Sequence, residues 1–178
     1  MIIKKMGWNV LVVLSLLSVA SSALAQTPEE KLASLKLTLP PVSKAIANYV
    51  PAVRTGNLLF LAGHLSRDVE GKVIAGKVGS TVDEAKAVEA AQRTALALIA
   101  TLKAELGDLR RVKRIVRVGG FVNCTEEFTR QPVVINGCSD LLVAVFGDAG
   151  RHARAAIGTN ALPLGAVVEI ELIAEVSD

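Results

Sequence analysis

The segment Val168-Glu169-Ile170-Glu171-Leu172-Ile173-Ala174 decides the fold of this chain. It lies within 166–176, where Val168, Ile170, Leu172 and Ala174 alternate with Glu169, Glu171, Ile173 and Glu175. Successive side chains of a strand point to opposite faces, so this pattern predicts a strand with an apolar core face and a second, more polar face. Exposure to solvent is enough to explain a glutamate at position 175 of this polar face. If Glu171 is covered, burial would raise its pKa and would let the carboxyl hold a water and pass protons.

An unusual arginine stands in the strand predicted just before this segment, over 153–159. Arg154 has only small or apolar neighbours, in the run Ala153-Arg154-Ala155-Ala156-Ile157-Gly158. A guanidinium is a rigid fork that suits a carboxylate. Two interpretations stay open: Arg154 pairs with Glu169 or Glu171 on the neighbouring strand, or it binds an anionic ligand in a pocket lined by the small side chains.

The upstream half of the chain predicts two strands and a helix. The apolar run 57–66 predicts a strand covered on both faces, with a hairpin return near Val73-Ile74. Thr81 to Glu84 has the form of a capping box. Apolar residues at three- and four-residue spacing then predict a helix that ends at Leu106-Gly107.

A further strand and a second helix complete the predicted elements. Residues 112–122 alternate, with Val112, Val116, Val118 and Val122 on one face. The second helix is expected from about Pro132 to Phe146, stopping at Gly147. The order strand, strand, helix, strand, helix, strand, strand, with hairpins at both ends, indicates an α+β domain. Its mixed sheet would carry both helices on one face.

The N-terminus has the pattern of a secretory signal peptide over residues 1–25. A basic start precedes the apolar run 6–20, which is shorter than the roughly 20 residues of a comfortable membrane span. Ala23-Leu24-Ala25 fits a cleavage site, and an uncleaved anchor is the alternative. Cleavage would leave a polar linker over 26–40 and one domain over 41–178. The protein would then be periplasmic or secreted, with no membrane contact.

Composition and motifs exclude several functional classes. Without the signal, the chain has 18 Lys and Arg and 17 Asp and Glu, a net charge of +1. This low charge and the small number of aromatic residues both argue against a nucleic-acid partner. No metal-ligand spacing, nucleophile motif or phosphate loop is present, so neither a metal nor a cofactor is expected. His64 has the default interpretation of a hydrogen-bonded, half-buried histidine. Cys124 and Cys138 are either one disulfide or two free thiols.

The C-terminal motifs resemble those of the RidA family of reactive intermediate deaminases, formerly YjgF. The residues that carry the resemblance are Ala153–Ile157, Ala161-Leu162-Pro163 and Val168–Ala174, with Gly56-Asn57-Leu58, Ala62-Gly63-His64 and Tyr49-Val50 upstream. It spans roughly 41–176. The segment Asn136-Gly137 to Gly147, followed by Arg151-His152-Ala153-Arg154, is similar to a less-studied branch of the family.

The resemblance implies a chorismate-mutase-like fold and a homotrimer with clefts between subunits. It also implies hydrolysis of enamines and imines such as 2-aminoacrylate to a 2-oxo acid and ammonia. Five residues would take part. Arg154 would grip the substrate carboxylate, Glu171 would position the attacking water, Gly63 would offer a backbone amide, Ala156 a backbone carbonyl, and Tyr49 would line the cleft from the adjoining subunit.

One departure from the family pattern affects the expected activity. Deaminating members commonly carry a hydroxyl residue where this chain has Ala62, so one hydrogen bond is lost, which His64 would have to replace. Three functions follow, in order of preference. The first is an imine or enamine deaminase, the second a non-catalytic binder of small carboxylates in the same cleft, and the third a ribonuclease or chaperone-like interaction protein.

Overall fold

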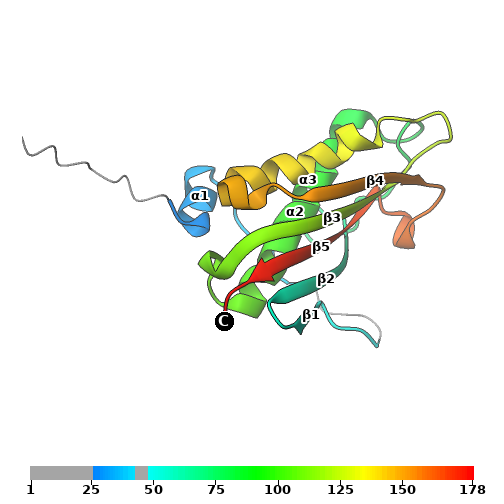
Figure 1. Ribbon diagram of the computed structural model, residues 1–178. Coiled ribbons are helices and arrows are strands. Elements are labelled where there is room, and N and C mark those ends of the chain that lie inside the picture. The colour runs from blue at the N-terminus through cyan, green and yellow to red at the C-terminus, as the bar shows by residue number, and fades with distance from the viewer. Residues whose placement is uncertain (1–25, 43–47) are drawn as a thin grey trace, which may run out of the picture.

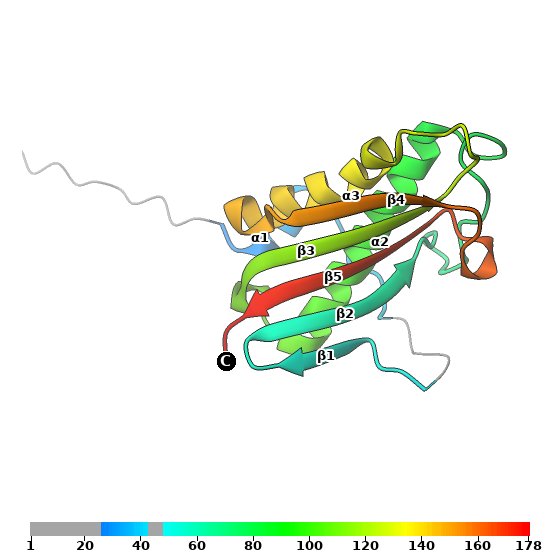
Figure 2. The same ribbon diagram turned by 45° about the vertical axis from the view of Figure 1, so that its right-hand side comes forward.

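A five-stranded mixed sheet forms the framework of the protein in this computed structural model, which describes residues 26–42 and 48–178. The strands lie in the order β1-β2-β5-β3-β4, as Figure 2 shows. All neighbouring pairs are antiparallel except β3 and β4, which run parallel. The bounds are β1 Ala52–Thr55, β2 Leu58–Leu65, β3 Val112–Asn123, β4 Ala153–Thr159 and β5 Val168–Val176. The prediction of an α+β chorismate-mutase-like fold is confirmed.

The alternation in β5 divides the sheet into two faces. Val168, Ile170, Leu172 and Ala174 are buried, whereas Glu169, Glu171 and Ile173 are only partly buried. We call the first side the helix face and the second the open face. Because β5 is the middle strand, its pattern fixes which side of the whole sheet becomes the core.

Two long helices cover the helix face, as predicted. They are α2 (Glu84–Leu106) and α3 (Gln131–Phe146), and both lie behind the sheet in Figure 1. Close packing depends on small residues. A Cβ on Gly137 of α3 would collide with the backbone carbonyl of Val88 on α2, and one on Gly120 of β3 would lie 2.7 Å from the Ile135 side chain. These glycines let both helices approach closely.

The N-terminal segment differs from the predicted linker. Residues 28–34 form helix α1 (Pro28–Ser34), capped by Thr27 and Glu30 in a reciprocal capping box and packed against α3. Polarity alone had suggested a linker, but Leu32 is buried and the charged residues lie in a capped turn. The predicted signal peptide, 1–25, lies outside the described residues.

Three details of the first half also differ. The hairpin pairs β2 with β1, which the sequence analysis missed, while Val73 forms only an isolated bridge with Arg67. Helix α2 is capped by Asp83, because the Thr81 hydroxyl accepts from the amide of Lys77 instead. β2 is covered on one face only, since Leu59 and Leu61 are buried but Phe60 is 40% exposed.

β3 and β4 supply two more corrections. β3 contains register shifts, so Ile115 is fully buried, although simple alternation placed it on the other face of the strand from Val118. The predicted C-terminal hairpin is wrong, because β3 lies between β4 and β5. The short 3-10 segments are Leu109–Arg111, Gly147–Gly150 and Pro163–Gly165.

Two further properties concern the described residues. Cys124 and Cys138 are separate buried thiols, and burial raises the pKa of Cys138 to about 12. Gln131–Gly150 is long and apolar enough to cross a membrane by length and composition, but half of it is buried inside the fold as a core helix.

Candidate functional site

Arg154 is held by helix α3 and not by a carboxylate. Its Nη1 donates to Asn136 Oδ1 at 2.8 Å and to Ser139 Oγ at 3.0 Å. Within 26–42 and 48–178, no Asp or Glu lies within ion-pair distance of Arg154. The predicted salt bridge to Glu169 or Glu171 is therefore wrong. The guanidinium is exposed, and its positive charge has only neutral partners.

Strand register places Arg154 and Glu171 on opposite faces of the sheet. Arg154 pairs with Val118, which is fully buried on the helix face. Ala155 and Glu171 both pair with Gly119, on the open face. Partners in a ladder share a face, so one chain does not bring its own Arg154 and Glu171 to a common substrate.

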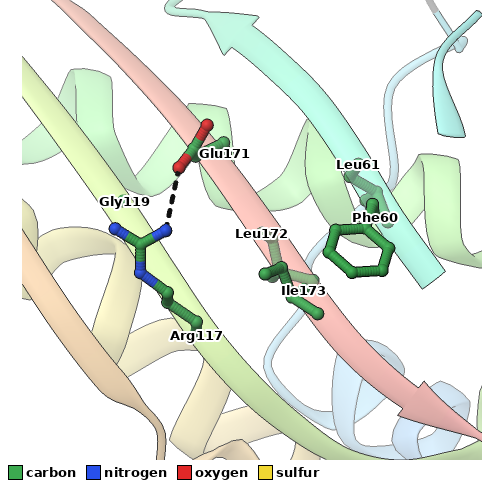
Figure 3. Close-up of a pocket in the computed structure, with 7 residues that line it drawn as sticks. All are labelled: Phe60, Leu61, Arg117, Gly119, Glu171, Leu172 and Ile173. Atoms are coloured by element: carbon green, nitrogen blue, oxygen red, sulfur yellow. Dashed lines mark hydrogen bonds and ion pairs between the residues drawn. The ribbon is translucent and has the colours of Figure 1, made fainter. Parts of the chain in front are cut away.

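Glu171 is bound by a different arginine. Arg117 of β3 lies two residues before Gly119, and its Nη1 is 3.4 Å from Glu171 Oε1, as Figure 3 shows. The pair borders a shallow open-face pocket of about 220 Å³. The lining residues are Phe60, Leu61, Arg117, Gly119, Glu171, Leu172 and Ile173. Arg117 was not expected at this site, because the alternation over 112–122 indicates only a strand.

Glycines make room for the two carboxylates of β5. A Cβ on Gly119 would lie 2.6 Å from Glu171 Oε1, and one on Gly63 would collide with the carboxylate of Glu169. Burial, and secondarily the nearby Glu171, raises the pKa of Glu169. Of these two carboxyls of β5, Glu169 is thus the one that burial shifts toward its protonated form.

The other predicted substrate contacts are spread over the fold. Tyr49 is half exposed in the segment before β1, and Ala62 and Gly63 form an irregularity in β2. Ala156 pairs with Gly120 on the helix face, the side of Arg154. Among these residues, the structure brings Ala156 and Arg154 to one face of one strand, and it leaves the role of each backbone group a prediction.

His64 is occupied inside the fold. Its Nδ1 donates to the Ala62 carbonyl at 2.7 Å, and its Nε2 lies 2.8 Å from Thr101 Oγ1 of α2. Burial lowers its pKa, so the ring is neutral at pH 7. These contacts agree with a structural histidine that joins β2 to α2. They leave the ring no free nitrogen to replace the missing hydroxyl at Ala62.

A serine and a second histidine stand beside Arg154. Ser139 Oγ lies 3.0 Å from His152 Nε2, and His152 Nδ1 lies 2.6 Å from the Gly150 carbonyl. Burial, with the charge of Arg154 as a smaller cause, lowers the pKa of His152. This Ser/His contact was not expected from the sequence, which shows no nucleophile motif. His152 stands directly before β4 and two residues before Arg154, a spacing visible in the sequence, but nothing in the sequence pointed to Ser139.

Within the residues that the structure describes, no group of three or more His, Cys, Asp or Glu side chains is placed to hold a metal ion. Among the described residues, we consider two groups of polar side chains as candidate sites. The first, which we call the edge cluster, comprises Asn136, Ser139, His152 and Arg154. The second is the open-face pocket around Arg117 and Glu171.

Comparison with known proteins identifies the family. Residues 29–176 match the family described as "YjgF/chorismate mutase-like, putative endoribonuclease". The chain belongs to this YjgF family. It is 39% identical over 145 residues to Protein TCP17 of Trypanosoma cruzi, covering 81% of this chain and 91% of that protein.

Solved structures of YjgF-like proteins share the fold. A protein of unknown function from Agrobacterium tumefaciens is 44% identical, with a TM-score of 0.78 over 85% of this chain and 94% of the other. A "putative endoribonuclease" from Shewanella oneidensis is 34% identical, with a TM-score of 0.82 over 85% and 100%. A RidA protein from Psychrobacter is more distant, at 26% identity and a TM-score of 0.53 over 76% and 94%.

Proposed function

We propose that this YjgF-family protein hydrolyses small imines or enamines that carry a carboxylate, of the 2-aminoacrylate type, to 2-oxo acids and ammonia. The exposed guanidinium of Arg154 supports this proposal. Asn136 and Ser139 orient it through Nη1 alone, and no carboxylate among the described residues neutralises it. A small carboxylate is a suitable partner for its remaining N–H groups.

The same features favour a small ligand over a large one. On the face of β4 that carries Arg154, the next residue is Ala156, whose small side chain adds little bulk beside the guanidinium. A neutral His152 close by adds no second charge, so the site carries one unit of positive charge for one carboxylate. Family membership is consistent with this activity, since a RidA protein is among the structural relatives.

We also propose that the protein is a homotrimer in which copies pack through the open face. Val53, Phe60 and Ile157 are 55%, 40% and 53% exposed on that face, an apolar surface that no helix among residues 26–42 and 48–178 covers. Exposed apolar patches of this kind mark interaction sites in soluble proteins. Assembly would place the Glu171 of one copy near another chain, the only way a cleft could combine it with Arg154.

Assays of 2-oxo acid formation and ammonia release from freshly generated 2-aminoacrylate test the activity. Arg154→Ala is expected to lower kcat/KM about 10- to 100-fold, because the variant loses one pair of charge-assisted hydrogen bonds to the substrate carboxylate. Arg151→Ala is the matched control, because Arg151 is exposed nearby and binds only Asp148. A wild-type protein that gives no acceleration over buffer contradicts the proposal.

The alternatives predict different results in the same samples. If 2-oxo acids raise the Tm of wild type but not of Arg154→Ala, and no turnover occurs, the protein is a carboxylate binder. Cleavage of single-stranded RNA by wild type, without deamination, would instead support the endoribonuclease name that some relatives carry. Export to the periplasm or medium stays a prediction, testable by N-terminal sequencing of the mature protein.

A further inference from the structure

The edge cluster contains no carboxylate that could act as a base, although the proposed reaction needs a base. Hydrolysis of an imine requires a group that takes a proton from water while Arg154 holds the substrate carboxylate. Glu171 of the same chain lies on the opposite face of the sheet and is paired with Arg117. Among the groups of the same chain, a proton acceptor for a substrate held by Arg154 is therefore sought on the helix-face side of β4, where Arg154 lies.

We propose that Ser139 and His152 form the proton relay of this site, with His152 as the proton acceptor and Ser139 as the contact to the attacking water. The inference rests on the proposed deaminase function and assigns its base. It replaces the role that the family resemblance gave to Glu171 in the same chain.

The hydrogen bonds set the direction of the relay. A carbonyl oxygen only accepts, so the Gly150 carbonyl fixes the proton of His152 on Nδ1 at 2.6 Å. Nε2 is then an acceptor and receives the Ser139 hydroxyl at 3.0 Å. Arg154 Nη1 donates to the same Ser139 oxygen at 3.0 Å. The serine oxygen thus has a cation on one side and a base on the other.

The charged groups around His152 favour its neutral form. Burial and the positive charge of Arg154 lower its pKa. In the turn before it, Asp148 and Arg151 pair with each other at 3.2 Å. On α3, Cys138 is a buried thiol with a pKa of about 12, and Asp140 is exposed. His152 is therefore mostly unprotonated at pH 7, the state that a proton acceptor needs.

The proposed step balances without a cofactor. Water attacks C2 of the iminium carboxylate, its oxygen forms the new C–O bond, and the C=N π electrons move to nitrogen. The released proton passes through Ser139 Oγ to His152 Nε2. His152 then returns the proton to the amino group of the carbinolamine. As the C–N bond breaks, the hydroxyl oxygen forms the C=O bond and its proton leaves with the departing nitrogen, so that the iminium and water give a 2-oxo acid and an ammonium ion. Throughout, Arg154 holds the carboxylate with its Nε and Nη2 groups.

The pH profile of the active protein tests the relay. In wild type, kcat/KM should fall about tenfold per pH unit below the His152 pKa, which lies under the usual 6.5. His152→Gln should lower kcat/KM by about 10²- to 10⁴-fold and abolish this acid limb. Ser139→Ala should lower kcat/KM less than His152→Gln does, because a water can take the place of the serine hydroxyl. It should also keep the acid limb of the pH profile.

Three controls make the result decisive. Asp140→Asn and Arg151→Ala change exposed neighbours and should leave rate and pH profile unchanged. Added imidazole should restore part of the activity of His152→Ala, an effect that a merely structural role would not produce. Circular dichroism and thermal unfolding establish that each variant is folded.

Two failures can be told apart. An inactive wild-type protein contradicts the proposed function itself. An active wild type whose acid limb survives in His152→Gln but disappears in Glu171→Gln overturns the relay and returns the base to Glu171, supplied by a neighbouring copy.

Discussion

The two faces of one sheet differ in what satisfies their charged groups. On the open face, Glu171 is balanced by Arg117 at 3.4 Å, over glycines that leave space for carboxylates. At the edge of the helix face, Arg154 has only neutral partners, Asn136 and Ser139. The comparison separates a charge that the fold already neutralises from a charge that has no ionic partner among the described residues, and that difference supports the proposed site at β4.

The largest expected effect separates two adjacent residues of β5. Leu172 is 1% exposed on the helix face, so Leu172→Ala should lower the free energy of unfolding by about 2–5 kcal/mol at any protein concentration. Ile173 faces the open side. Ile173→Ala should cost less than about 1 kcal/mol in the separated chain and should weaken assembly instead.

Urea denaturation and sedimentation equilibrium of both variants provide the measurements. If Ile173→Ala leaves the oligomer intact at the lowest concentration studied, the open face is not the interface between copies. If it costs as much as Leu172→Ala in a protein that stays monomeric, the contrast between the two faces is wrong.

Two consecutive glycines of β3 give the next effect. Gly120→Ala would put a Cβ 2.7 Å from Ile135, a fully buried side chain, and should cost about 1–3 kcal/mol by overpacking. Gly119→Ala would meet only the Glu171 side chain, at Oε1, Cγ and Cδ, and this partly exposed side chain can change rotamer toward solvent. It should cost less than about 1 kcal/mol. Thermal unfolding of the two variants side by side checks the order, and a reversed order would contradict the assignment of faces.

Local patterns predicted the elements that carry strong periodicity. The bounds of β4 and of α3 match their predicted positions, and α2 ends at Leu106 before Gly107 as expected. Caps and bulges were harder, because Thr81 and Asp83 are both competent N-caps and only the packed chain decides between them. α1 and β1 are short: α1 packs against the distant helix α3, and β1 is a mostly exposed strand that pairs only with β2.

The arrangement of the candidate site residues differs from the expected one for a reason that lies in topology. The expected pairing of Arg154 with Glu169 or Glu171 assumed that β4 and β5 are neighbours. β3 inserts between them, and its parallel register with β4 turns Arg154 to the helix side. Such pairings are non-local and leave no mark in periodicity. Ser139 was missed because its role arises only when α3 packs over β4.

The smallest expected effect distinguishes the two carboxylates of the open face. The pKa of Glu169 is raised by burial and by Glu171, so its ionised form destabilises the folded state. This raised pKa makes the folded chain relatively more stable below the unfolded value of about 4.5, and that gain is lost as the pH rises through the folded pKa. Glu169→Gln should therefore stabilise the protein slightly at pH 7, by less than about 1 kcal/mol given its partial exposure, and not at pH 4.

Glu171→Gln should do the opposite at pH 7, because it removes the partner of Arg117 and leaves that guanidinium unpaired. Free energies of unfolding of both variants at pH 7 and pH 4 measure the difference. Stabilisation by Glu171→Gln at pH 7 would show that the Arg117 pair does not balance the open face, and the contrast with Arg154 would then lose its basis.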